Sequence, residues 1–324
     1  MDKNRNSRPL IAHLSMFGAC AIWGLMAPLG KDAMTHGLDG ITMVSMRVFG
    51  GMMLFWLTSL IITFRTKRLT QATREHVPMR DRLMFCGAAL FGLVFNQCCY
   101  TLGLSITSPI NASIVTTSMP IFAMILAAII LKEPITGKKA LGVLTGCSGA
   151  LILILTSAAA TTDKVGDIRG DLLCLGAQFS FALYLSLFNP LIRRYSVFTI
   201  NKWMFLWATL IIAPFTIPHM LTTEWSAVTT LSWWEAAYVV VFGTFIGYIL
   251  TMIGQRTLRP TVVSTYNYVQ PIVSVTVSII TGIGIFQWSQ ALAVILVFAG
   301  VWWVTKSKSR RDMEREKSLS EPLP

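Results

Sequence analysis

Ten runs of mostly apolar residues follow one another along the chain, separated by short polar segments. They cover residues 11–30, 41–64, 83–104, 110–131, 138–157, 171–190, 198–219, 236–255, 261–281 and 285–305. A helix needs roughly 20 apolar residues to cross the hydrocarbon core of a bilayer, and each run is close to that length. The pattern therefore predicts an all-α membrane protein with ten transmembrane helices.

The chain also contains an internal repeat. Residues 91–149 align without a gap on residues 242–300 at a constant offset of 151, with 12 identities among 59 pairs. The matched positions include Phe91-Gly92 with Phe242-Gly243, Gly103 with Gly254, Pro109 with Pro260, Ser113 with Ser264, Pro120 with Pro271, and Gly149 with Gly300. Shared transmembrane composition accounts for part of such a match, but Gly and Pro in register indicate backbone geometry used twice. Repeated halves are common in secondary transporters.

Ten helices divide into five and five, and an odd number per half requires the second half to enter the membrane from the opposite side. Lys and Arg placement tests this expectation independently. With both termini in the cytoplasm, 23 basic residues fall on the inner side and only Lys31, Lys164 and Arg169 on the outer side. This asymmetry fits the positive-inside rule. We therefore expect two inverted five-helix repeats, residues 1–157 and 158–305, followed by a charged cytoplasmic tail, residues 306–324.

Composition agrees with a membrane location. Hydrophobic residues make up 54% of the chain and charged residues 13%, against about 25% charged in soluble domains, and the mean hydropathy is +0.61. The formal charge of +12 comes from basic residues dispersed over inner loops and the tail, so no nucleic-acid partner is expected.

The sequence does not favour a membrane-embedded enzyme. It has no HExxH or GxSxG motif and no pair of aspartates inside a span, although such an enzyme would need a nucleophile, a carboxylate pair or a metal set. The six cysteines all fall in predicted spans without CxxC spacing, so they are interpreted as small apolar packing residues. No cofactor or metal is expected.

Arg47 is the clearest ionisable residue inside a predicted span, and such residues are functional candidates because their burial is costly. It could bind a carboxylate or phosphate, or extend to lipid headgroups. A rough overlay of the second and seventh spans places Lys202 opposite it, with the same two interpretations. Every Asp and Glu lies in a loop, in the tail or at a span end. Because proton-coupled carriers usually have a titratable group at depth, we expect facilitated diffusion or exchange.

Uncharged polar and aromatic residues reach the expected midplane. The candidate substrate-binding residues are Trp23, Arg47, Asn96, Gln97, Tyr100, Asn111, Thr117, Gln178, Tyr184, Tyr248, Tyr266, Asn267 and Gln270. Amide and phenol groups can bind a polar solute while the rings cover its apolar part. Each residue alone could instead form an interhelical hydrogen bond, and Trp23 could simply pack. As a group they are expected to line a cavity.

Pro120 and Pro271 lie inside the fourth and ninth predicted spans, at equivalent repeat positions. Each removes one backbone hydrogen bond. The pair is therefore interpreted either as hinges for alternating access or as kinks that serve packing.

Several short motifs are similar to those of one transporter family. They are Trp23-Gly24, Arg47, Ser108-Pro109 with Ala112-Ser113 and Pro120, Lys132-Glu133-Pro134-Ile135-Thr136, the glycines 142, 146 and 149, Gly170-Asp171-Leu172-Leu173, Arg259-Pro260 and Gln270-Pro271. Over nearly its whole length the chain resembles EamA-type ten-helix members of the drug/metabolite transporter superfamily. One departure is that Ile283-Gly284, with no acidic residue, stands where the second repeat often has Leu-Gly-Glu.

The resemblance implies an exporter of amino acids or related small metabolites, working through a central cavity between the halves. The alternative within the superfamily is a carrier of nucleotide sugars or phosphorylated metabolites, which would need several basic residues around the cavity. The expected partners are a small-molecule substrate and membrane lipids, with the chain acting as a monomer. The expected location is the plasma membrane, the inner membrane in a bacterium.

Overall fold

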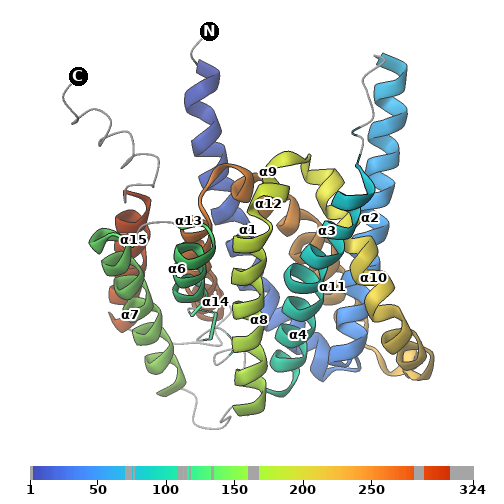
Figure 1. Cartoon of the computed structure of the whole chain (residues 1–324). Helices are drawn as coiled ribbons and strands as arrows, with labels where there is room; N and C mark the ends of the chain where they lie inside the picture. Colours follow the sequence, from blue (N-terminus) through green and yellow to red (C-terminus); the bar gives the residue numbers. More distant parts are fainter. Residues whose placement is uncertain are drawn as a thin grey trace, which may run out of the picture.

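A computed structural model describes residues 3–69, 75, 77–107, 112, 115–116, 118–132, 135–159, 168–280 and 288–306. Within these residues all regular structure is helical. The helices run side by side as one bundle, and the start of the first helix and the end of the last lie at the same end of it (Figure 1).

The first half contributes seven labelled segments. They are α1 (Lys3–Thr35), α2 (Gly40–Leu69), α3 (Met79–Ala89), the π-helix η1 (Leu90–Phe95), α4 (Asn96–Ile106), α6 (Met119–Ile130) and α7 (Gly137–Ala159). The second half contributes the remainder. They are α8 (Ile168–Leu187), α9 (Asn189–Arg194), α10 (Val197–Thr222), the 3-10 turn η2 (Trp225–Ala227), α11 (Thr230–Tyr238), the π-helix η3 (Val239–Ile246), α12 (Gly247–Thr257), α13 (Pro260–Thr265), the 3-10 turn η4 (Tyr266–Tyr268), α14 (Val269–Ile280) and α15 (Trp288–Thr305). Each of the ten apolar runs thus contains helix.

The chain is an all-helical integral membrane protein. In the described part, five continuous helical stretches are long and apolar enough to cross a bilayer: Pro9–Thr35, Gly40–Arg65, Met79–Ile106, Val197–Thr222 and Thr230–Thr257. Two shorter apolar helices are Met119–Ile130 and Leu172–Leu187.

Residue spacing on α1 explains how such a helix packs. Ala12, Met16, Ala19 and Cys20 recur every three or four residues and are almost fully buried, which is the spacing of one helix face. Leu10 and Leu14, on the other face, are 60% and 62% exposed. An apolar side chain can remain on the outer surface because lipid tails solvate it, so small residues and not bulk hydrophobicity determine the packed face.

The helix boundaries reproduce the repeat found in the sequence. The first residues of α3 and α4 are 79 and 96, and those of α11 and α12 are 230 and 247, so each pair differs by 151. The π-helices η1 and η3 also end at equivalent residues, Phe95 and Ile246. Since π-helical turns are rare and often functional, their recurrence at one place supports a repeated architecture.

Equivalent helices of the two halves pack directly on each other. Helix α2 contacts α10, and α7 contacts α15. The second contact is backbone on backbone: a Cβ added to Gly300 would lie 2.6 Å from the carbonyl oxygen of Gly142 and 2.7 Å from the amide nitrogen of Gly146. Close approach of this kind requires glycine.

The two candidate hinge prolines occupy different helical contexts. Pro120 lies in the first turn of α6, where a proline is tolerated because the N–H groups there have no intrahelical partner. Pro271 is the third residue of α14, and α13, η4 and α14 follow one another without a break, so it lies inside the helical run 260–280. The hinge role of both prolines remains a prediction.

Candidate functional site

A polar cavity lies where the two halves meet. It is lined by Trp23, Met26, Arg47, Asn96, Gln97, Tyr100, Thr116, Gln178, Phe181, Tyr248, Asn267 and Gln270. These residues come from α1, α2, α4, α8, α12, η4 and α14, together with Thr116. The space open to the centre of a water molecule is about 50 Å³. Since one water needs roughly 10–15 Å³ by this measure, the cavity has room for a few waters or a very small solute.

Nine of the thirteen candidate residues line this cavity. They are Trp23, Arg47, Asn96, Gln97, Tyr100, Gln178, Tyr248, Asn267 and Gln270. Tyr184 and Tyr266 do not line it, and Asn111 and Thr117 lie outside the described residues.

Three lining residues are not among the candidates: Met26, Thr116 and Phe181. Met26 and Phe181 were missed because neither is polar. Helical spacing could have indicated both. Met26 follows Trp23 by three positions and Phe181 follows Gln178 by three, and residues three apart share a helix face.

Among the described residues that line the cavity, Arg47 is the only Lys, Arg, His, Asp or Glu. Its side chain is 4% exposed. Nε donates to the Thr244 hydroxyl at 3.3 Å and Nη1 donates to the Thr101 hydroxyl at 3.1 Å. Thr101 belongs to α4 and Thr244 to η3, so the guanidinium joins the two halves. The side chain therefore lies inside the bundle.

Gln97 and Tyr248 are hydrogen-bonded across the cavity wall. The Gln97 amide Nε2 donates to the Tyr248 hydroxyl at 2.9 Å. The Tyr248 hydroxyl in turn donates to the Gly92 carbonyl oxygen at 3.5 Å. Both side chains are nearly fully buried. The contact joins α4 to α12.

The π-helices supply backbone acceptors beside the cavity. A π-helical turn shifts the usual hydrogen-bond pattern and leaves carbonyl groups for side chains. The Trp23 indole Nε1 donates to the Gly243 carbonyl oxygen in η3 at 2.8 Å, and Ser180 Oγ donates to the Phe91 carbonyl oxygen in η1 at 2.7 Å. Each donor lies in the opposite half from its acceptor.

The candidate residues Tyr184 and Tyr266 lie outside the cavity. Tyr184 is 1% exposed, and its hydroxyl donates to Gln255 Oε1 at 3.2 Å. Its ring lies 5.6 Å from that of Phe181, a lining residue. The Tyr266 hydroxyl is hydrogen-bonded to His13 Nδ1 at 2.6 Å. Tyr184 therefore packs behind a lining residue, and Tyr266 joins η4 to α1.

Lys202 does not form a counterpart to Arg47 in the cavity. Its Nζ lies 5.2 Å from the ring centroid of Trp56 and 5.8 Å from that of Trp203. These are cation–π distances, so the second cation is held between aromatic rings of α2 and α10.

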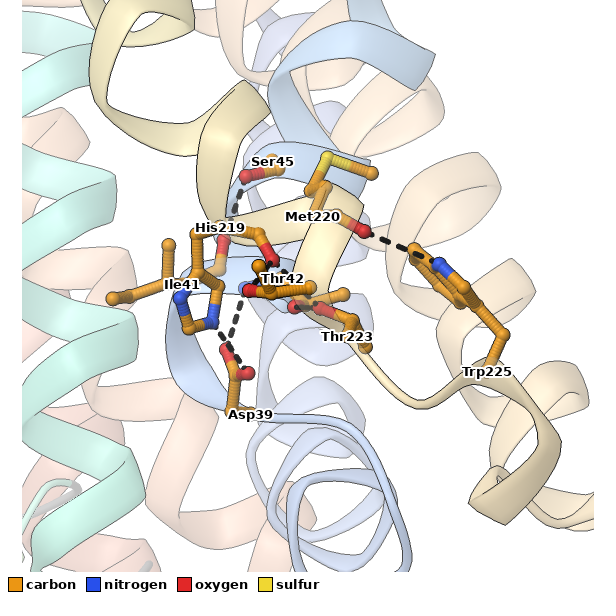
Figure 2. Close-up of polar contacts among 9 residues, drawn as sticks. Asp39, Ile41, Thr42, Ser45, His219, Met220, Thr223 and Trp225 are labelled. Atoms are coloured by element: carbon orange, nitrogen blue, oxygen red, sulfur yellow. Dashed lines mark hydrogen bonds and ion pairs between the residues drawn. The ribbon is translucent and has the colours of Figure 1, made fainter.

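Polar contacts join the halves at both ends of α10. Near its C-terminus, His219 Nε2 lies 2.7 Å from Asp39 Oδ2, and Thr42 Oγ1 lies 3.2 Å from Thr223 Oγ1 (Figure 2). Asp39 also accepts from the Thr42 backbone N–H at 2.7 Å, which caps the start of α2.

At the opposite end of α10, Asp81 of α3 is the central group. Its Oδ2 lies 2.9 Å from Arg194 Nη1 and accepts a hydrogen bond from the Tyr195 hydroxyl. The Asp81 side chain is almost fully buried. Both ends of α10 are therefore tied to the first half by acidic side chains.

In the described part of the chain, no cluster of three or more His, Cys, Asp or Glu residues has the arrangement of a metal site. The cavity instead offers one guanidinium, several amides and hydroxyls, and four aromatic rings. Such a set can hold a small polar solute by hydrogen bonds and ring contacts.

Comparison with known proteins identifies relatives of matching length. The chain is 23% identical over 228 residues to the uncharacterized transporter YetK of Bacillus subtilis, which covers 70% of this chain and 68% of that one. It is 22% identical over 229 residues to the uncharacterized transporter YyaM of the same organism, covering 70% and 75%. A solved crystal structure of a protein 17% identical superposes with a TM-score of 0.69 over 98% of this chain and 99% of that one, which shows a shared fold.

The model of the EamA-like transporter family matches residues 10–155 and again residues 168–306. Together the two matches cover the described bundle almost completely. The chain belongs to the EamA-like transporter family.

Proposed function

We propose that this protein is a secondary transporter that exports amino acids or related small polar metabolites by alternating access. It spans the plasma membrane ten times as two inverted five-helix repeats, residues 1–157 and 158–305, with both termini and the tail 306–324 in the cytoplasm. The solute occupies the cavity between the halves.

The observation that carries this proposal is that both halves supply the cavity lining in equivalent ways. Gln97 and Tyr248 stand at the same repeat position, and both line the cavity. A site shared between inverted halves can be exposed to either side when the halves rock against each other.

Three further observations agree with a carrier. Family membership is that of transporters. The cavity in this form has about 50 Å³ for water centres, whereas ligand sites usually measure about 300–1,000 Å³, as expected if this form is nearly closed. Opening to one side or the other could then break the His219–Asp39 contact or the Arg194–Asp81 contact, which lie at opposite ends of α10.

The lining also bears on coupling and on substrate size. The described lining residues include no Asp, Glu or His, which supports facilitated diffusion or exchange over tight proton coupling. Arg47 is the only basic lining residue, and this disfavours nucleotide sugars or other solutes with several negative charges.

Solute exchange in proteoliposomes tests the proposal. Vesicles loaded with an unlabelled pool of amino acids and related metabolites are diluted into labelled members of the same pool. Transient counterflow is expected for wild type, because a carrier exchanges external label for internal solute. Accumulation driven by an imposed pH gradient would contradict the uncoupled mechanism.

A matched pair of variants locates the pathway. Gln178→Trp places an indole ring in the cavity. Phe179→Trp places the same ring at the neighbouring position, where the native side chain does not line the cavity and is 44% exposed. The first should abolish most counterflow and the second should retain it. Equal counterflow in both variants, or none in wild type, would contradict a solute path through this cavity.

A further inference from the structure

Arg47 is a buried cation that has no carboxylate partner among the described residues. Its hydrogen bonds in the described structure are to the hydroxyl groups of Thr101 and Thr244. Hydroxyl groups satisfy N–H donors but do not neutralise a full charge. No carboxylate lies within 4 Å of the guanidinium among the described residues.

The full sequence also shows no acidic residue near the lining positions, including positions outside the described residues. No Asp or Glu occurs at positions 40–74, 82–132, 172–223 or 236–311. Every lining residue outside α1 falls in one of these intervals, and positions 3–31 of α1 also contain no acid. On α1 and α8 the acids nearest in sequence to the lining residues are Asp32, six positions after Met26, and Asp171, seven positions before Gln178. No acid therefore lies within the stretch of a helix that lines the cavity.

An isolated charge inside a bilayer-spanning bundle is costly, and removing an opposite charge from a buried pair leaves a large penalty. A solute that brings a carboxylate into the cavity would remove this cost and form charge-assisted hydrogen bonds with the guanidinium. A zwitterion would bring the carboxylate but would leave an ammonium group without a carboxylate partner. A net monoanion leaves the loaded cavity neutral.

Gln97 indicates a second feature of the solute. Its Nε2 donates to Tyr248, while its Oε1 is buried and has no hydrogen-bond partner. A buried acceptor without a donor costs free energy. A hydroxyl group on the solute would supply that donor beside Arg47.

Resting on the proposed function, we infer that the preferred solute is a small hydroxylated monocarboxylate with a net charge of minus one. Arg47 serves as its counter-ion, and Gln97 Oε1 accepts from its hydroxyl group. Zwitterionic amino acids bind more weakly at the same site.

Five solutes of nearly equal size test the inference: lactate, propionate, alanine, lactamide and alaninamide. Their binding to the purified protein in detergent is measured through intrinsic tryptophan fluorescence and thermal stabilisation, at pH 7 and fixed ionic strength. Lactate should bind about tenfold or more tightly than lactamide, the size expected for charge-assisted bonds. Propionate and alanine should fall between them, and alaninamide should bind least.

Variants assign the preference to Arg47. Arg47→Gln should reduce the lactate-to-lactamide ratio to near one, and Arg47→Lys should restore part of it. Lys202→Gln removes a cation that lies between tryptophans and does not line the cavity, so it should leave the ratio unchanged. Because the wild-type order of the five solutes is itself decisive, a poorly folding Arg47 variant does not weaken the test.

The outcomes separate this inference from the proposed carrier function. If alanine or lactamide binds as well as lactate, or if Arg47→Gln keeps the wild-type ratio, the monoanion inference is overturned, while counterflow of alanine would still support a carrier. If lactate binds in an Arg47-dependent way but shows no counterflow, the anion site stands and transport of that anion is overturned.

Discussion

The Gln97 amide donates to the Tyr248 hydroxyl, and the two residues are 151 positions apart, which is the offset of the internal repeat. The two equivalent positions thus touch one another across the junction of the halves. The hydrogen bond also places that junction at the cavity wall.

A double-mutant cycle should show that these two residues are coupled. Gln97→Leu and Tyr248→Phe each remove one side of the hydrogen bond. In a membrane protein such a bond is worth about 0.6 kcal/mol on average and at most about 1.7 kcal/mol, so a coupling energy in that range is expected. It is measured from denaturant unfolding in detergent micelles.

Tyr238→Phe provides the control for this cycle. The Tyr238 hydroxyl donates to the Ile22 carbonyl oxygen and not to Gln97. Combined with Gln97→Leu it should give additive effects, since sites without shared partners usually add. Additivity of Gln97→Leu with Tyr248→Phe would argue against the bond.

Gly300→Ala should destabilise the protein because the α7–α15 contact is backbone on backbone. The added methyl would lie under 3 Å from backbone atoms of Gly142 and Gly146, so the helices must separate. Overpacking of this kind costs about 1–3 kcal/mol, and thermal unfolding measures it.

Gly176→Ala is the matched control. No atom lies within 4 Å of the position its methyl would take, and alanine favours a helix over glycine by roughly 0.5–1 kcal/mol. This variant should be neutral or slightly more stable. The same loss of stability in both variants would show that close packing is not the cause.

Lys31→Met should destabilise the end of α4. The Lys31 ammonium donates to the carbonyl oxygens of Leu104, Ser105 and Thr107 at 3.0, 2.9 and 2.9 Å. These groups end a helix and lack intrahelical partners. A loss of about 1–3 kcal/mol is expected, measured by chemical denaturation. Arg80→Met, at an exposed position, should change stability by less than about 0.5 kcal/mol.

Asp39 predicts a dependence of stability on acid pH. Burial raises the pKa of Asp39, but hydrogen bonds from Thr42 and His219 outweigh this effect and lower the pKa below its ordinary value. A carboxylate with a lowered pKa stabilises the fold above its unfolded pKa, about 3.9, and this contribution is lost as the pH falls through the folded pKa.

The measurement compares melting temperatures of wild type and Asp39→Asn between pH 7 and pH 3. Wild type should melt at the higher temperature near neutrality, and the difference should shrink below about pH 4. A constant difference over the whole range would mean that the charge of Asp39 makes no contribution.

The apolar runs predicted helix in every one of the ten segments, because length and hydropathy are read directly from composition. The ends of the helices were predicted less accurately. Helix α1 extends to Thr35, beyond the expected end near residue 30, since Lys31 turns its charge to backbone carbonyls of α4. In the sequence, a lysine in a loop cannot be distinguished from a lysine whose ammonium group caps the end of another helix.

Polar residues in apolar runs indicated most of the cavity lining, because a buried polar group needs a partner or a solute. Periodicity did not separate Tyr184, which packs behind the lining, from Tyr248, which forms it. The tertiary arrangement decides which face of a helix meets the cavity. The π-helices left no mark in the hydrophobic pattern either.

A π-helical turn arises when one residue is inserted into an established α-helix. Segments η1 and η3 carry this irregularity at equivalent positions, ending at Phe95 and Ile246. The irregularity is thus shared by both halves, and in each half the widened turn offers a backbone carbonyl to a side chain of the other half. The two halves are therefore fastened to each other in a reciprocal way.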